Sequence, residues 1–416
     1  MYNLHLTAEQ LEIRDTVRDF VAQEIKPVAL KSARLEANER HFPPEIIDKA
    51  SQMGLRTLAL SEAAGGAGAD NLTSCIVTEE LAAGDVDFAA TLAATSILGR
   101  VLFDQAMTPE QRARFLPRFL ADDRYHLAYA DHEPDTDTEL GINYHRANVT
   151  ESVVKTTAVK QSNGDWLVNG VKNFIINAPL AGLIAVQVKT DTKVPGMNGV
   201  SALLVTPGMP GLTIKEHDPG WYHGTRGELV FKDCRVPAAN LLGAEGKSPL
   251  SGGTGSPLSG GAGSMGRGIP QFEALNLGIG RAAYEAALDY AKLRIQGGRP
   301  IIEHQAIGTL LAGIAIKLEV ARNMVWRAAW ASDHPDAYTD RSLADLPLET
   351  IARVFTSEAV HQVALDAAEC FGAMGVMRDM PLQKYVRDAL ICLHSDPSVK
   401  DAKLRIAEAV AGYERK

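Results

Sequence analysis

Four cysteines are the first candidates for metal or redox chemistry in this chain, and they lie at Cys75, Cys234, Cys370 and Cys392. They are far apart and form no Cys-x-x-Cys pair, the spacing that zinc sites and redox dithiols usually show. The sequence therefore predicts no metal site and no disulfide framework. Buried, inert thiols are the simpler interpretation.

Two charged positions in the C-terminal third of the chain can each be interpreted in a structural or in a chemical way. Asp396 directly precedes Pro397, and Asp followed by Pro is a common helix start. A carboxylate can also act as a general base. Arg294 opens the run Arg-Ile-Gln-Gly-Gly-Arg-Pro, where it suits either a helix C-terminus or an anionic ligand.

The composition is that of an ordinary globular protein, with 46% hydrophobic and 22% charged residues in 416. A formal net charge of -9 argues against a nucleic-acid-binding protein, which needs a basic face. The N-terminus shows no signal-peptide pattern, and no apolar run approaches the roughly 20 residues of a membrane span. We expect a cytoplasmic protein.

The elements that must position these residues change type along the chain. Thr7 and Gln10 form a capping-box pattern, and helical patterns follow at 44–53, 72–84 and 109–119. Short β-type runs occupy 153–159, 166–168, 183–189, 200–206, 212–216 and 228–231, with Asn163-Gly164 and Asn169-Gly170 predicted as turns. Long helices are predicted at 272–296, 301–332, 348–371, 381–392 and 398–413.

The order predicts a mainly α protein with a central β-domain. Its expected parts are an N-terminal helical domain (1–124), a middle β-domain (125–243), a flexible loop (244–270) and a C-terminal helical bundle (271–416). The loop is rich in Gly and Ser and repeats the hexad SPLSGG, so it cannot pack a core.

Six segments in this order resemble the acyl-CoA dehydrogenase superfamily, and they lie at 6–29, 61–85, 154–177, 228–243, 294–315 and 383–389. The resemblance covers nearly the whole chain. It implies a middle β-barrel domain, a C-terminal four-helix bundle, and FAD bound between them with its ADP part reaching a neighbouring subunit. It also implies a homotetramer or homodimer, with an electron-transfer flavoprotein as a partner.

The resemblance implies oxidation of an acyl-CoA or an unusual acyl-thioester. A carboxylate removes the proton alpha to the carbonyl, and hydride passes from the beta carbon to flavin N5. Counting from Arg387-Asp388-Ala389 places this base on Asp396. The family usually has Glu there, so Asp396 is shorter by one methylene. The base and the helix cap are both compatible with this position.

The cofactor residues implied by the resemblance fall into two groups. His132 and Glu133 match the strand at the pyrimidine end of the flavin, and Phe174, Ile176 and Asn177 match the Trp-Ile-Thr-Asn segment. Ile176 replaces the Thr that donates to N5, and it has no donor.

The second group would hold the ADP part of FAD. It comprises Arg294, Gln305, Gly372 and Gly375.

The substrate side departs more from the family pattern. Arg226 and Asp137 stand at positions expected to contact substrate. Glu133, Asp135 and Asp137 bring three acids near one segment, which is unfavourable for a polyphosphate such as CoA. We therefore expect an altered substrate entrance.

Two alternatives remain open at this point. One is a nitroalkane-oxidase-like flavin oxidase or monooxygenase acting on a small carbon acid, with Lys403 supporting the Asp396 base. For Lys403 we favour a solvated face of the final helix over this role. The other is a non-redox member that has lost the flavin, as Ile176 suggests.

Overall fold

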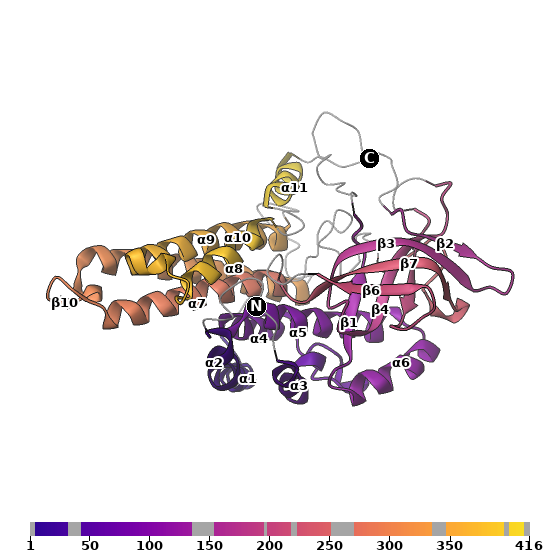
Figure 1. Cartoon of the computed structure of the whole chain (residues 1–416), viewed down its shortest axis with the longest axis horizontal. Helices are drawn as coiled ribbons and strands as arrows, with labels where there is room; N and C mark the ends of the chain where they lie inside the picture. The colour runs from indigo at the N-terminus through magenta and orange to yellow at the C-terminus, as the bar shows by residue number, and fades with distance from the viewer. Residues whose placement is uncertain are drawn as a thin grey trace.

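The computed structural model describes residues 5–31, 43–134, 154–194, 198–217, 223–250, 270–334, 347–394 and 399–411. Asp137, Asp396 and most of the Gly/Ser-rich segment lie outside these residues. Within them, a helical bundle extends to one side, an N-terminal group of helices lies beneath its inner end, and a β-sheet lies on the other side (Figure 1).

The N-terminal part consists of helices that pack across the base of the bundle. Their bounds are α1 (Ala8–Phe20), α2 (Lys26–Ala29), α3 (Pro44–Gln52), α4 (Asn71–Gly84), α5 (Val86–Gly99) and α6 (Pro109–Ala121). The predicted capping box is present, because Thr7 accepts from the Gln10 amide and Gln10 accepts from the Thr7 amide. Residues 86–106 are apolar enough to cross a membrane, but 89% of that window is buried, as in a core helix.

The middle part is one sheet whose strands are paired in the order β6-β7-β3-β2-β4-β5-β8, with β1 parallel to β4. Their bounds are β1 (His126–Ala130), β2 (Thr157–Lys160), β3 (Trp166–Ile176), β4 (Ala181–Lys189), β5 (Val200–Val205), β6 (Leu212–Glu216), β7 (Arg226–Val236) and β8 (Leu241–Leu242). The central antiparallel pair is β3 with β7.

One turn prediction in this sheet is wrong. Asn163-Gly164 precedes β3 as predicted, but Asn169-Gly170 lies inside β3. Gly170 has φ 145°, and a Cβ there would lie 2.6 Å from the Thr156 Cα. The glycine thus permits a close backbone approach at a register shift of the β3–β7 pair, not a reversal of the chain.

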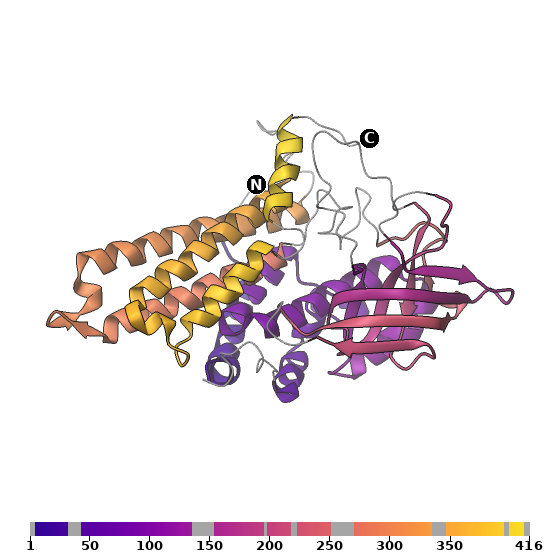
Figure 2. The ribbon, with the colours of Figure 1, turned by 45° about the horizontal axis from the view of Figure 1, so that its top comes forward.

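The C-terminal part is a helical bundle with a short hairpin at its far end (Figures 1 and 2). Its elements are α7 (Gln271–Leu293), β9 (Ile295–Gln296), β10 (Arg299–Pro300), α8 (Gln305–Asp333), α9 (Leu348–Phe371), α10 (Leu382–His394) and α11 (Val399–Ala411). The predicted bounds of α9 agree with the structure. The helix predicted at 272–296 ends at Leu293, because Ile295 and Gln296 pair with β10.

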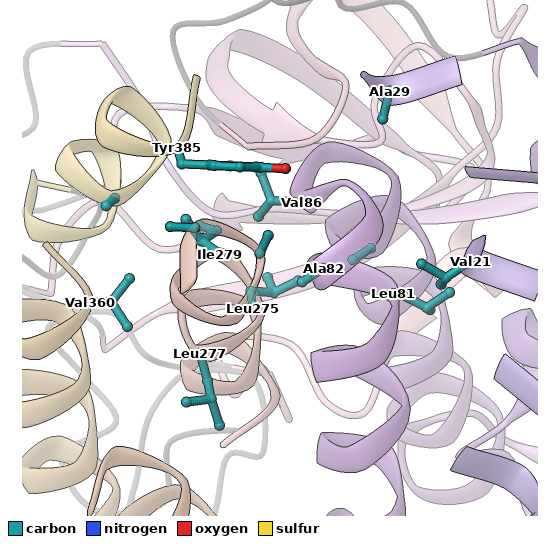
Figure 3. Packing of buried hydrophobic residues seen from close by; sticks show 14 of the residues in the cluster. Val21, Ala29, Leu81, Ala82, Val86, Leu275, Leu277, Ile279, Val360 and Tyr385 are labelled. Carbon is teal, nitrogen blue, oxygen red and sulfur yellow. The ribbon is translucent and has the colours of Figure 1, made fainter. Parts of the chain in front are cut away.

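Helix α7 is the central element that joins the N-terminal helices to the bundle. A Cβ on Gly278 would lie 2.5 Å from the Ala82 Cβ, so only glycine lets α4 approach this closely. Above this contact, Tyr385 of α10 lies over Val86 and Ile279 (Figure 3). Helices α4, α5, α7 and α10 share one hydrophobic core. The predicted mainly α fold with a central sheet is confirmed.

Candidate functional site

A bulge near the end of β3 is the most unusual feature of the sheet. The β3–β7 register shifts between Lys172 and Ile175, and Phe174 inside the shift has φ 55°. Positive φ is strained for an aromatic residue, at about 1–3 kcal/mol, and such strain concentrates at functional sites. Arg226 stabilises the bulge, because its Nη1 donates to the Phe174 carbonyl at 2.8 Å. The bulge aims the Phe174 ring away from the regular strand direction.

Two histidines flank the Phe174 ring. The His132 ring lies 6.1 Å from it, and the His217 ring lies 5.2 Å away at 33°. His217 Nε2 donates to Asn173 Oδ1 at 2.6 Å, and the Asn173 amide donates to the His132 carbonyl at 3.0 Å. The side chains of His132, Phe174 and His217 are neither fully buried nor fully exposed. They form an aromatic surface that can stack against a planar ligand.

Glu133 does not offer its carboxylate to a ligand. Its Oε1 lies 2.7 Å from Lys172 Nζ and also accepts from the Thr156 amide, while its Oε2 accepts from the Lys155 amide. Glu133 and Lys172 are almost fully buried. Burial opposes ionisation, but Lys172 lowers the pKa of Glu133 below its ordinary value. Glu133 therefore holds the segment after β1 that presents His132.

Ile176 and Asn177 join β3 to α5. The Asn177 amide group donates to the Thr91 carbonyl at 2.9 Å and to Thr95 Oγ1 at 3.1 Å, and its side chain is fully buried. Asn177 Oδ1 has no hydrogen-bond partner among the described residues. Ile176 lies beside Gly224, where a Cβ would approach Ile176 Cγ1 to 3.2 Å. Ile176, which was predicted to lack a hydrogen-bond donor, therefore makes an apolar contact with Gly224.

The predicted ADP-binding residues gather at the far end of the bundle. Arg294 follows the end of α7 and Gln305 begins α8, and both are exposed. The Tyr290 and Phe371 rings stack at 4.1 Å, which joins the ends of α7 and α9 beside Gly372. A Cβ on Gly375 would lie 2.6 Å from the Ala368 carbonyl oxygen, so this turn accepts only glycine. The sheet lies on the opposite side of the molecule (Figure 1).

The substrate-side predictions have different outcomes. Asp137 and Asp396 lie outside the described residues, and Asp396 follows the end of α10 by two positions in the sequence. Two donors of Arg226 are used within the chain, on the Phe174 and His223 carbonyls. Its contact with a substrate stays a prediction. Lys403 pairs with Glu358 on the exposed side of α9 and α11, which favours the solvated-face interpretation.

Some site residues were not anticipated from the sequence. Lys172, His217 and His223 each contact a predicted site residue. Lys172 had a detectable signal, because a lysine inside an apolar strand pattern requires a buried counter-charge. The four cysteines are buried, as predicted. Among the described residues, no group of three or more His, Cys, Asp or Glu side chains is placed to hold a metal ion.

Comparison with known families covers most of the chain. Residues 7–123 match "Acyl-CoA dehydrogenase, N-terminal domain", residues 145–234 match "Acyl-CoA dehydrogenase, middle domain", and residues 270–393 match "Acyl-CoA dehydrogenase, C-terminal domain". The chain belongs to the acyl-CoA dehydrogenase family. It is accordingly an FAD-dependent oxidoreductase of the acyl-CoA dehydrogenase type, acting on CH–CH groups.

Individual acyl-CoA dehydrogenases resemble the chain over nearly its full length. An "Acyl-CoA dehydrogenase" of Bacillus subtilis (strain 168) is 34% identical over 392 residues, covering 93% of this chain and 94% of the relative. The structure of butyryl-CoA dehydrogenase from Megasphaera elsdenii is 27% identical, with a TM-score of 0.81 and coverage of 99% and 100%. A structure described as an electron transferring flavoprotein of Acidaminococcus fermentans is 28% identical, with a TM-score of 0.81 and coverage of 98% and 99%.

Proposed function

We propose that this acyl-CoA dehydrogenase oxidises an acyl-CoA or a related acyl thioester at its alpha and beta carbons, with Asp396 as the base. The carrying observation is that α10 ends beside the bulged end of the sheet. Cys392 Sγ lies 3.5 Å from His223 Nε2. Gly224, which follows His223 in the sequence, packs on Ile176. Asp396 follows Cys392 by four positions in the sequence, and this closeness along the chain to the end of α10 supports its assignment as the base.

The aromatic surface of the sheet fits the ring of FAD. His132, Phe174 and His217 present rings that can stack, and the strained Phe174 is held by Arg226 and the bulge. When bound, FAD supplies the hydride-accepting centre. The protein would orient that group with Phe174 and with the segment after β1 that carries His132, and Ile176 would keep one edge of the site apolar and dry.

Asp396 would take the proton from the carbon next to the thioester carbonyl. General-base catalysis needs the carboxylate within about 2.6–3.2 Å of that carbon acid, directly or through one water. Because Asp is one methylene shorter than Glu, the acyl chain must enter closer to the end of α10. We therefore favour a compact acyl group over a long one.

The arrangement of the two cofactor groups supports self-association. The aromatic surface of the sheet and the predicted ADP-binding residues at the far end of the bundle lie on opposite sides of one chain (Figure 1). Helix α7 alone spans about 34 Å between them. Leu293, Ile295 and Val376 are 81%, 63% and 70% exposed at the distal end. A second copy that covers these apolar side chains could bring its distal arginine to the first copy's flavin. We expect a homodimer or a homotetramer, measured by light scattering at several protein concentrations.

Anaerobic mixing with a panel of acyl-CoAs of increasing chain length tests the reaction class. The expected result is bleaching of the flavin absorbance, strongest with short acyl groups. An acceptor assay with an electron-transfer flavoprotein should then restore the oxidised spectrum. Oxygen consumption with a nitroalkane and no bleaching by any thioester would instead favour the flavin oxidase, and a colourless protein that takes up no FAD would favour the non-redox alternative.

A further inference from the structure

His223 is a buried histidine whose ring contacts two helices from different parts of the chain. It precedes β7, and only 8% of it is exposed. Its Nε2 donates to the Asp388 carbonyl of α10 at 3.1 Å, and its Nδ1 lies 3.7 Å from Asp87 Oδ1 of α5. Nε2 thus donates a hydrogen bond, while Nδ1 faces a carboxylate at an ion-pair distance that is too long for a hydrogen bond. A ring between a carbonyl and a carboxylate suits the doubly protonated imidazolium, because a neutral ring carries only one N–H.

The carboxylates near His223 outnumber the one lysine ammonium that lies among them, which favours a positive charge on the His223 ring. Asp85 caps the start of α5, Asp87 lies in the first turn of α5, and Asp388 lies on α10. The Lys384 ammonium joins Asp85 to Asp388. Lys384 Nζ lies 2.8 Å from Asp388 Oδ2 and 3.3 Å from Asp85 Oδ2. Two carboxylates thus share one ammonium, and the third carboxylate, Asp87, lies beside His223 instead. In a buried site an uncompensated charge is costly.

The protonation preference agrees with this geometry. Burial alone would lower the pKa of His223, but the Cys392 sulfur and the Asp87 and Asp388 carboxylates outweigh it and raise the pKa to about 10. The groups that face the ring are Asp87 from α5 and Asp388 and Cys392 from α10. The imidazolium is therefore the form at neutral pH.

The backbone next to His223 is fixed against the proposed flavin site. The Gly224 amide donates to Asp87 Oδ1 at 3.0 Å, and Arg226 Nε donates to the His223 carbonyl at 3.1 Å. Gly224 has φ 76°, and a Cβ there would lie 3.2 Å from Ile176 Cγ1. The same short segment thus contacts α5, α10 and Ile176.

We propose that protonated His223 is a positioning residue, which holds α5, α10 and the start of β7 together around Ile176 and thereby strengthens FAD binding. The proposal rests on the proposed function, because it requires FAD beside Ile176. Its positive charge also favours the reduced, more electron-rich flavin over the oxidised form. Loss of the charge should therefore weaken the binding of reduced FAD more than that of oxidised FAD.

The test compares His223→Gln with wild type and with His361→Gln, a half-buried histidine of α9 that serves as the matched control. The dissociation constant of FAD is measured by adding FAD to the cofactor-free protein, and the flavin potential is measured on the reconstituted protein. We expect about tenfold weaker binding of oxidised FAD in His223→Gln. A further tenfold loss for reduced FAD corresponds to a two-electron potential about 30 mV more negative. His361→Gln should match wild type in both measurements.

Two outcomes separate the proposals. If wild type binds FAD and His223→Gln binds it equally well with an unchanged potential, the positioning role is wrong and the proposed function stands. If wild type binds no FAD, the proposed function fails, and this role with it. Should His223→Gln not fold, Asp87→Asn provides the same test, because its amide oxygen still accepts from the Gly224 amide but carries no charge. We expect at least threefold weaker FAD binding in that variant, and unchanged binding would overturn the proposal.

Discussion

Lys172 Nζ lies 2.7 Å from Glu133 Oε1, and both side chains are excluded from solvent in the two segments that carry His132 and Phe174. Removing one member of a buried ion pair leaves the other charge without compensation, at a cost of about 3–5 kcal/mol. We therefore predict that Lys172→Met lowers the free energy of unfolding by roughly that amount and weakens FAD binding. Denaturant titration and FAD titration measure the two effects.

An exposed pair in the same sheet provides the control for this prediction. Lys215 Nζ lies 3.0 Å from Glu228 Oε1, but the Lys215 side chain is 64% exposed. Exposed pairs contribute about 0–1 kcal/mol, so Lys215→Met should change the unfolding free energy by no more than that. Equal losses from the two variants would contradict the structural role of the buried pair.

We predict that the free energy of unfolding falls in mild acid because of His126. Burial, with a smaller effect of Arg56, lowers the pKa of His126 to about 4 from the ordinary value of 6.5. The unfolded chain therefore binds more protons between these values, and the contribution present above pH 6.5 is lost as the pH falls to 4. The loss is on the order of 3 kcal/mol. His126→Leu should flatten this limb of the stability profile.

Unfolding free energies measured from pH 7 to pH 4 test this prediction. His334→Gln, a change at an exposed histidine, should leave the acid limb as steep as in wild type. A His126→Leu profile parallel to that of wild type would show that another group causes the acid sensitivity.

We predict that replacing two helical glycines by alanine changes the protein's stability in opposite directions, because only Gly278 lies in the close contact between α4 and α7. A Cβ on Gly278 would lie 2.5 Å from the Ala82 Cβ and 2.7 Å from the Glu79 carbonyl oxygen, so Gly278→Ala should cost about 1–3 kcal/mol. Gly313 of α8 has nothing within 4 Å of such a Cβ. Gly313→Ala should therefore stabilise the protein by up to about 1 kcal/mol through helix propensity. Thermal melts of both variants decide this, and a stabilised Gly278→Ala would refute the close contact.

The sequence patterns predicted the helices better than the strands. The α9 bounds agree with the prediction, and the helix ends directly before Gly372, a local stop signal. The extent of β3 does not agree, because Asn169-Gly170 has the composition of a turn, and only its position against Thr156 places it inside a strand. Local composition cannot reveal which backbone approaches a glycine.

The candidate site was predictable where residues follow one another and hidden where distant segments meet. Phe174, Ile176 and Asn177 were found as one segment, but their supports come from elsewhere: Arg226 from β7, Thr91 from α5 and His217 after β6. The His223 cluster depends on α5, α10 and β7 together. Such contacts depend on tertiary packing, which one sequence does not specify directly.

The most direct test of the central claim is the anaerobic half-reaction of Asp396→Asn with butyryl-CoA. The variant should bind FAD and the thioester as wild type does, and the rate of flavin bleaching should fall by at least a hundredfold, as expected for a lost general base. Asp396→Glu should retain measurable bleaching, because it keeps the carboxylate. Bleaching of Asp396→Asn at the wild-type rate would contradict the assignment of Asp396 as the base.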